Sequence, residues 1–189
     1  MATREIIHLD SRTIKVLAHP LRLRLLGLLR VEGPSTATEL AERTGHNSGA
    51  TSYHLRQLAE VGLVEEQPDM GNKRQRFWKA SQHGMSWRDT EYDHDPDAHA
   101  AADWLTRHMH RQYGRWVDDW LDARSEWPAE WRDAADQSDF GVTVTADQLI
   151  EIQRRVREIY EEYDTDDPAE GAERVSLINY AIPRRAVRF

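Results

Sequence analysis

The sequence predicts an α+β protein, mainly α, that is built in two parts, and three observations support this. Residues 11–62 carry apolar side chains at helical spacing, and residues 63–80 then alternate as strands do on either side of a turn-forming stretch. Residues 1–80 hold 12 Lys and Arg against 9 Asp and Glu, whereas residues 81–189 hold 13 against 24. Six of the seven tryptophans also follow residue 80. We therefore expect a first domain at residues 1–82 and a helical and β-α-β region for dimerisation or effector binding at 83–189.

Composition excludes several classes of protein and site. The 189 residues are 39% hydrophobic and 31% charged, which is ordinary for a globular chain with a real core. There is no cysteine, so disulfides, thiolate metal sites and cysteine nucleophiles are excluded. We see no apolar leader and no run of 18 apolar residues, and we expect a cytoplasmic protein without a membrane segment. Because the sequence has no G-x-S-x-G, phosphate-binding glycine loop or H-E-x-x-H, we expect neither an enzyme nor a cofactor.

Three helices are predicted before residue 46. The first begins near residue 11 and breaks at His19, and Pro20 then starts the second, where a missing N–H is harmless. Gly33 ends the second helix. Thr36 and Glu39 have the spacing of a capping box, which predicts the start of a short third helix.

A fourth helix is predicted over residues 47–60, with Asn47 as its N-cap. Thr51, Leu55 and Leu58 fall on one stripe at about 100° per residue, and the polar residues point the other way. Two short helices joined by a tight turn, the second with a polar outer face, form a helix-turn-helix pattern. We expect the outer face to lie in the major groove of double-stranded DNA.

Residues 63–80 are predicted to form a β-hairpin with cations at and just past its tip, which makes the domain a winged helix. The hairpin cations could reach phosphates that flank the groove. The alternative is a winged helix that docks on a protein, and it predicts that these cations are held in ion pairs. The expected DNA contacts are Asn47, Ser48, Ser52, Tyr53, Arg56, Gln57, Lys73, Arg74 and Arg76.

The segments LAHPLRLRLLGLL, TELAERTG, SYHLRQLAEVGLV and RFWKA occur in the order and spacing of a known family. They resemble the ArsR family of winged-helix bacterial transcription regulators, in particular its actinobacterial members, over about residues 11–80. The resemblance implies a homodimer that represses promoters, with the recognition helix at residues 47–60. Two-fold symmetry would then require an inverted-repeat operator. The sequence departs from metal-sensing members of the family in lacking their cysteine pair.

Histidines and aspartates just after the hairpin raise the alternative of a metal-sensing repressor with His and Asp ligands. They are His94, His99, His108, His110, Asp93, Asp95, Asp97 and Asp103. His99 and Asp103 are four residues apart and could share one ion. His108 and His110 are two apart, however, and point to different sides of a helix. A solvated polar face is the simpler interpretation, and we expect no metal site.

The second region is predicted to hold a long helix over residues 96–125, followed by a β-α-β unit. The helix carries the large aromatic residues Trp104, Tyr113, Trp116 and Trp120. They could be packed core and dimer interface, or a pocket for a small organic effector. Strands are expected near residues 140 and 178, and a helix opened by Thr145 and Gln148 is expected between them. Its apolar stripe is Leu149, Ile152, Val156 and Ile159. Two strands alone are marginal, so pairing with a second protomer or packing on the tryptophan-bearing helix is expected.

Overall fold

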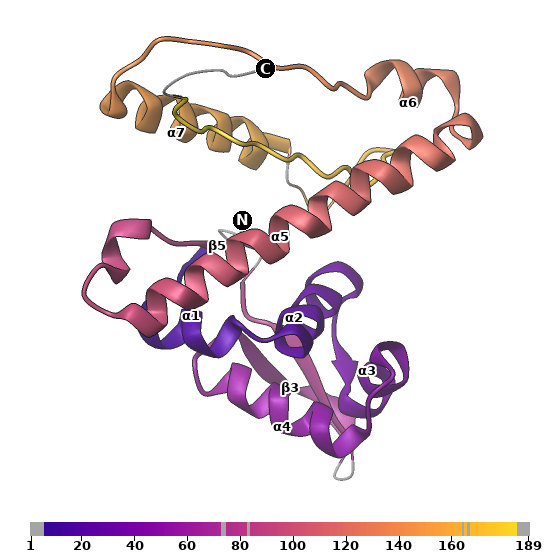
Figure 1. Ribbon diagram of the computed structural model, residues 1–189. Helices are drawn as coiled ribbons and strands as arrows, with labels where there is room; N and C mark the ends of the chain where they lie inside the picture. The colour runs from indigo at the N-terminus through magenta and orange to yellow at the C-terminus, as the bar shows by residue number, and fades with distance from the viewer. Residues whose placement is uncertain (1–5, 73–74, 83, 164, 166, 185–189) are drawn as a thin grey trace. The chain divides into compact units, whose positions relative to one another are not determined.

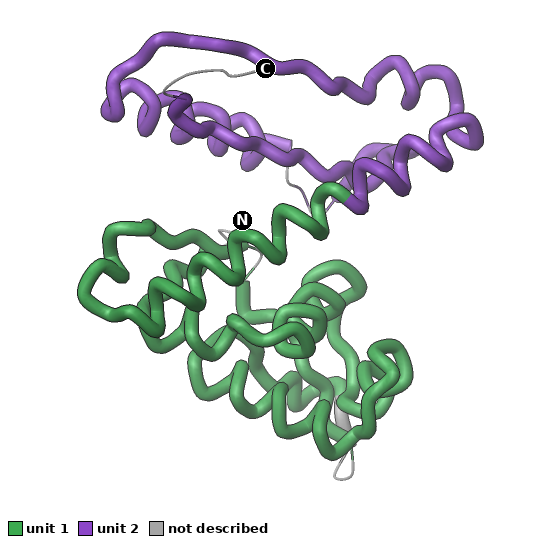
Figure 2. The backbone as a smooth tube through the Cα atoms, in the orientation of Figure 1, with its two compact units in different colours: residues 1–114 green, residues 115–189 purple. Residues whose placement is uncertain are grey.

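The computed structural model describes residues 6–72, 75–82, 84–163, 165 and 167–184. It divides into two compact units, residues 1–114 and residues 115–189 (Figure 2). The helix α5, Pro96–Ala123, begins in the first unit and continues into the second. Each unit is described separately below.

The first unit is a winged helix, as predicted. Three helices, α1 (Ser11–Leu17), α2 (Pro20–Glu32) and α3 (Ala37–Thr44), precede the recognition helix α4 (Ser48–Ala59) (Figure 1). The strands β2 (Ser35–Thr36), β3 (Val64–Asn72) and β4 (Gln75–Ala80) form an antiparallel sheet in the order β2-β4-β3. The mixed α+β class is thus confirmed for this unit.

Local signals set the ends of these helices as the sequence indicates. Pro20 is the first residue of α2, and the Nδ1 of His19 accepts a hydrogen bond from the amide of Leu21 at 3.2 Å. Thr36 and Glu39 form both hydrogen bonds of the capping box. Gly45 ends α3 with φ +73°, a left-handed conformation that favours glycine. The turn into α4 is therefore fixed by the residues that make it.

A second, small sheet ties the N-terminus to the segment after the hairpin. The strands β1 (Ile6–His8) and β5 (Gly84–Ser86) pair in parallel. Next to them, the buried hydroxyl of Tyr92 donates to the carbonyl of Leu9 at 2.5 Å. Arg30 reaches from α2 to the carbonyls of Gln82 and Gly84, both at 3.2 Å. Burial lowers the pKa of the Arg30 guanidinium to about 10. These contacts tie the segment before α5 to the N-terminus and to α2, and the sequence did not predict them.

The start of α5 belongs to the core of the first unit. Ala98, Ala102 and Leu105 are buried, and they join the cluster formed by the leucines of α1, α2 and α4. A three- to four-residue spacing places all three on one side of the helix. The compact unit thus extends to Gly114, well beyond the boundary predicted after residue 82.

The second unit differs from the predicted β-α-β arrangement. Its helices are the end of α5, a short α6 (Ala129–Ala134) and α7 (Ala146–Tyr163). The α7 helix and its capping box are as predicted, with Thr145 and Gln148 bonded to each other at 2.9 and 3.2 Å. Among the described residues, 139–145 and 173–184 form no strand. Neither segment pairs with a strand among the described residues, and β structure requires such a neighbour.

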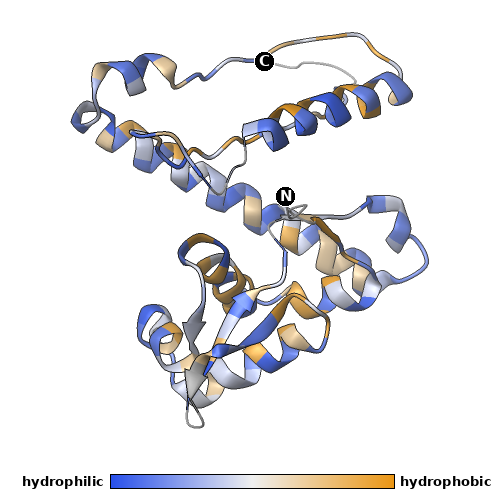
Figure 3. Cartoon of the chain, turned by 180° about the vertical axis from the view of Figure 1, so that it is seen from behind, coloured by the Kyte–Doolittle hydropathy of each residue, from blue (hydrophilic) through white to orange (hydrophobic). Residues whose placement is uncertain are grey.

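The predicted apolar stripe of α7 is also not buried. Ile152 and Ile159 are 38% and 53% exposed. Hydrophobic and hydrophilic residues both occur along this helix (Figure 3), and none of its residues is buried. The side chain of Asn179 donates to Gln153 at 3.0 Å and places the C-terminal segment beside α7. The local sequence, with its capping box, favours this helix without burial of its apolar stripe.

Two histidines pack α2 against the recognition helix. The rings of His19 and His54 lie 4.5 Å apart between centroids, tilted by 38°. Burial lowers the pKa of both, and Arg22 and His46 nearby lower it further. The Nδ1 of His19 accepts the capping bond, so this ring is neutral in the folded state.

We predict that shortening a core side chain of α5 destabilises the winged-helix unit. Leu105 is fully buried, so Leu105→Ala should lower the free energy of unfolding by about 2–5 kcal/mol. Leu121 lies on the same helix in the second unit and is 38% exposed, so Leu121→Ala should cost under about 1 kcal/mol and serves as the matched control. Denaturant unfolding of the two full-length variants measures the difference. Equal costs would mean that α5 is not part of this core.

We also predict that acid destabilises the joint between α2 and α4. Because the pKa values of His19 and His54 are lower in the folded protein, the unfolded chain binds protons first as pH falls below about 6.5. Stability should then decrease between pH 7 and pH 5. The double variant His19→Ser, His54→Gln keeps an N-cap but does not titrate, and should lose less stability over that range. Thermal unfolding at the two pH values tests this, and an unchanged pH dependence would count against it.

Candidate nucleic-acid interface

The recognition helix α4 is held by one fully buried stripe. Thr51, Leu55 and Leu58 are 0% exposed, as the helical spacing predicted. The hydroxyl of Thr51 is satisfied by the carbonyl of Asn47 at 3.1 Å, which lets a polar side chain lie in the core. Burying this stripe fixes the rotation of the helix about its axis. The opposite face is therefore presented in one orientation.

Asn47 sets the start of the recognition helix. Its Oδ1 accepts from the amide of Ala50 at 2.8 Å, which is an N-cap contact. The predicted cap is confirmed. This bond positions the helix and does not use the side-chain NH2 of Asn47, so the DNA contact expected at Asn47 stays a prediction.

The wing presents two faces that differ in chemistry. In the β3–β4 register Glu65 lies opposite Lys79, and Glu66 lies opposite Trp78. Because successive side chains alternate between faces, Arg76 shares the face of Trp78. Arg76 pairs with Glu66 at 2.7 Å, and Lys79 pairs with Glu65 at 2.9 Å. The wing cations that the structure describes are both in ion pairs.

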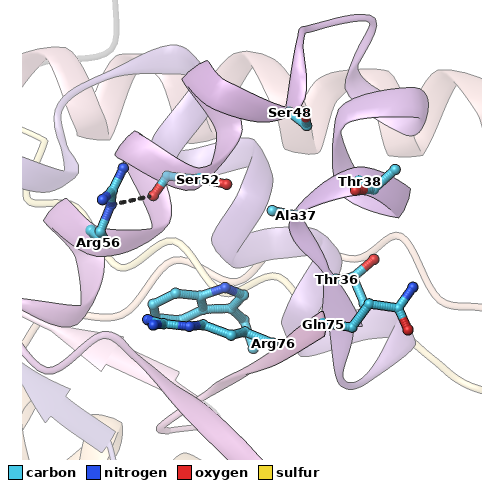
Figure 4. A pocket seen from close by; sticks show the side chains of 9 residues that line it. Thr36, Ala37, Thr38, Ser48, Ser52, Arg56, Gln75 and Arg76 are labelled. Carbon is cyan, nitrogen blue, oxygen red and sulfur yellow. Dashed lines mark hydrogen bonds between the residues drawn. The ribbon is translucent and has the colours of Figure 1, made fainter. Parts of the chain in front are cut away.

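An open hollow lies where the recognition helix, the start of α3 and the wing come together (Figure 4). Its lining is Thr36, Ala37, Thr38, Ser48, Ser52, Arg56, Gln75, Arg76 and Trp78. Ser48, Ser52 and Arg56 follow one another at four-residue intervals, which places them on one side of the helix. The Nε of Arg56 donates to the carbonyl of Ser52 at 3.2 Å, and this contact directs the guanidinium along the helix.

This arrangement can bind a polyanion with hydrogen-bonding edges. Hydroxyls both donate and accept, and guanidinium groups present planar donors that match a phosphate or the edge of guanine. Four of the predicted contacts, Ser48, Ser52, Arg56 and Arg76, are brought together here.

Other predicted contacts lie apart from the hollow. Tyr53 is 53% exposed on α4 and meets His54 edge-on, with ring centroids 5.3 Å apart. The side-chain amide of Gln57 donates to Glu60 at 3.1 Å. Lys73 and Arg74 lie outside the described residues.

Three polar residues of the hollow were not predicted: Thr36, Thr38 and Gln75. Thr36 was recognised only as a helix cap. Its proximity to the wing follows from the pairing of β2 with β4, in which Thr36 lies opposite Phe77. A two-residue strand has no sequence signal of its own, so this contact was not visible before the fold was known.

The aromatic residues proposed as an effector pocket are divided between the two units. Trp104 stacks on His108 with centroids 4.8 Å apart, and Tyr113 is also in the first unit. Trp116, in the second unit, is 42% exposed. Trp120 lies beside Trp127, which in turn lies beside Trp131, at 5.9 and 6.2 Å between ring centroids. The aromatic cluster of the second unit therefore includes two tryptophans that we had not selected.

Within the part of the chain that the structure describes, we find no group of three or more His, Cys, Asp or Glu side chains that could hold a metal ion. His99 and Asp103, the pair considered as ligands, are both exposed on α5. No helix over the same described ranges is long and apolar enough to cross a membrane.

Residues 17–67 match a family model described as a helix-turn-helix domain. Over 56 residues the chain is 38% identical to the HTH-type transcriptional regulator YgaV of Escherichia coli strain K12, covering 30% of this chain and 57% of that protein. Over 54 residues it is 44% identical to the HTH-type transcriptional regulator NmtR of Mycobacterium tuberculosis strain H37Rv, covering 29% and 44%. The chain thus spans about half the length of these curated relatives.

Among solved structures, one described as a possible transcriptional regulator for arsenical resistance is 29% identical, with a TM-score of 0.33 over 59% of this chain and 96% of that one. The matched segment contains β2, α3 and α4, which line the hollow together with β4. Residues 17–67 of the chain are thus a helix-turn-helix domain, similar in sequence to the matching segments of these HTH-type transcriptional regulators.

Proposed function

We propose that this chain is a sequence-specific DNA-binding transcriptional regulator that represses the promoter it binds. The observation that carries the proposal is the hollow, in which three residues of α4 and one wing arginine face the same space. The curated relatives that match the helix-turn-helix segment are named as transcriptional regulators. Repression would follow from occupying DNA that the polymerase needs.

In this proposal the outer face of α4 lies in the major groove. Arg56 is the best-suited base reader, because its guanidinium can donate two parallel hydrogen bonds to O6 and N7 of guanine. Ser48 and Ser52 are short and can bond to phosphates or to base edges close to the helix. Arg76, on the wing, would contact the backbone and fix the register of the helix in the groove.

The rival proposal is that the winged helix docks on a protein, and one observation favours it. Both described wing cations are ion-paired, as this reading predicted. The pairs are solvent-exposed, however, with 69% exposure for Arg76 and 39% for Lys79. Exposed pairs contribute only about 0–1 kcal/mol and are easily exchanged for phosphate contacts. The pairing is therefore compatible with DNA binding, which remains the better proposal.

We further propose a homodimer assembled through the second unit. Apolar side chains there are unusually exposed, including Phe140 at 87%, Val142 at 67%, Ile150 at 68% and Ile182 at 72%. Such a surface normally finds a partner. A second copy would also supply the strand neighbours that residues 139–145 and 173–184 lack in the single chain.

Control by a small organic effector, rather than by a metal, is the regulatory part of the proposal. Soft metals prefer thiolates, and the sequence has none. The cluster of Trp120, Trp127 and Trp131 offers aromatic faces to an apolar ligand. A ligand would act only by binding two arrangements of the dimer with different affinity.

Our first functional prediction concerns Arg56. Arg56→Ala should weaken binding to a DNA site selected from a random pool by about 1–3 kcal/mol, and should relax the preference for one base pair. Arg111→Ala removes an exposed arginine of α5 outside the hollow and should leave affinity nearly unchanged. Fluorescence-anisotropy titrations, with and without a chelator, measure both, and the chelator should have no effect. Wild-type affinity in the Arg56 variant would refute the groove placement.

A second prediction concerns assembly on DNA. One recognition helix reads only a few base pairs, so a two-fold dimer should protect two inverted half-sites about 34 Å, or a multiple of that, apart. Nuclease footprinting of the selected site and sedimentation of the free protein at micromolar concentration give the two readouts. A monomer that protects a single half-site would exclude the dimer model.

A further inference from the structure

An acidic residue of the wing holds the arginine that faces the hollow. Glu66 on β3 lies opposite Trp78, and Arg76 is two residues before Trp78 on β4, so all three side chains are on one face of the wing. The Oε1 of Glu66 accepts from Nη1 of Arg76 at 2.7 Å. Arg76 lines the hollow together with Ser48, Ser52 and Arg56. A carboxylate is thus bonded to one of the two arginines that line the hollow.

This carboxylate is bonded to a guanidinium donor, Nη1 of Arg76, that could otherwise bind a nucleic-acid phosphate. Both groups are anions with paired acceptor oxygens, and both bind the same donors of a guanidinium. When DNA arrives, Arg76 must either leave Glu66 or share its donors, and the two anions then face each other well within a Debye length of about 8–10 Å. Glu66 therefore opposes any contact between this side of the wing and the DNA backbone.

We infer that Glu66 is an intramolecular competitor of DNA phosphate for Arg76, and that it sets how strongly the wing binds DNA irrespective of sequence. The inference rests on the proposed DNA-binding function. A phosphate contact carries no base information, so the competition weakens sequence-independent binding. Occupancy of a site then depends more on the base contacts of α4. Glu66 in this way determines specificity without touching a base.

The neighbouring ion pair provides a matched control. Glu65 and Lys79 are directly opposite each other on the other face of the same two strands, and their amine–carboxylate distance is 2.9 Å. Of the described residues, the hollow is lined by Arg76 and not by Glu65 or Lys79. Neutralising Glu65 removes the same charge from the adjacent position of the same strand. A general effect of net charge would appear in both variants, whereas competition at Arg76 appears in one.

The test compares Glu66→Gln and Glu65→Gln in the full-length protein. Glu66→Gln keeps the size of the side chain and should bind a 20-base-pair duplex of scrambled sequence about 3- to 10-fold more tightly than wild type at 0.1 M salt. Glu65→Gln should change that affinity less than about 2-fold. In an Arg76→Gln background the gain from Glu66→Gln should largely disappear, because the competed group is absent. Circular dichroism and thermal unfolding check that all four variants are folded.

The outcomes separate the inference from the function on which it rests. A wild-type protein that binds neither a selected site nor the scrambled duplex, even at low salt, would overturn the proposed function and the inference together. If wild type binds but Glu66→Gln binds equally or more weakly, only the inference fails, and in the weaker case Glu66 orients Arg76 for DNA. Equal gains in the Glu65 and Glu66 variants would also overturn it, since net charge alone would then explain them.

Discussion

The rest of the candidate interface depends on the burial of one helix face. Thr51, Leu55 and Leu58 leave no exposed surface, and a buried threonine must keep its hydrogen bond to the Asn47 carbonyl. Interiors are packed closely enough that a rotation of α4 would open voids on one side and clashes on the other. Ser48, Ser52 and Arg56 are thereby held toward the wing without being buried themselves. The orientation of the polar face is fixed because the buried apolar face cannot rotate.

Most of the first unit could be predicted because its signals are local. Each of these signals depends on a few adjacent residues, and the structure contains all of them. They are the helix starts at Pro20 and Thr36, the glycine turn at Gly45 and the Asn47 cap. The hairpin follows from strand alternation around a turn. The contacts that could not be predicted are long-range. The β1–β5 pairing and the hydrogen bond from Tyr92 to Leu9 join segments that are far apart in the sequence. Leu105 packs in the core although it lies past the expected domain boundary. Periodicity shows which face is buried but not against what.

In the second unit too, the local structure was predicted and the long-range pairing was not. The capping box at Thr145 predicted α7 correctly, since a helix satisfies its own backbone. A strand does not, and residues 139–145 have the composition of a strand without a neighbour in the chain. The apolar side chains of Phe140 and Val142 are largely exposed in the single chain. The sequence predicted two strands that would need further pairing or packing, and the described residues of these two segments form no strand.

The site itself was predicted in part, and the missing part is electrostatic. Sequence spacing identified Ser52, Arg56 and Arg76 as residues with suitable chemistry, and the structure brings them to one hollow. It could not show that Arg76 has a carboxylate partner, because that contact depends on strand register across the hairpin. The first half of the chain is only weakly basic, with 12 cations against 9 anions. In such a surface the position of each anion matters as much as the number of cations, because the carboxylate bonded to Arg76 offsets the charge of a cation that lines the hollow. A weakly basic winged helix can therefore favour contacts that read bases over contacts that only bind phosphate.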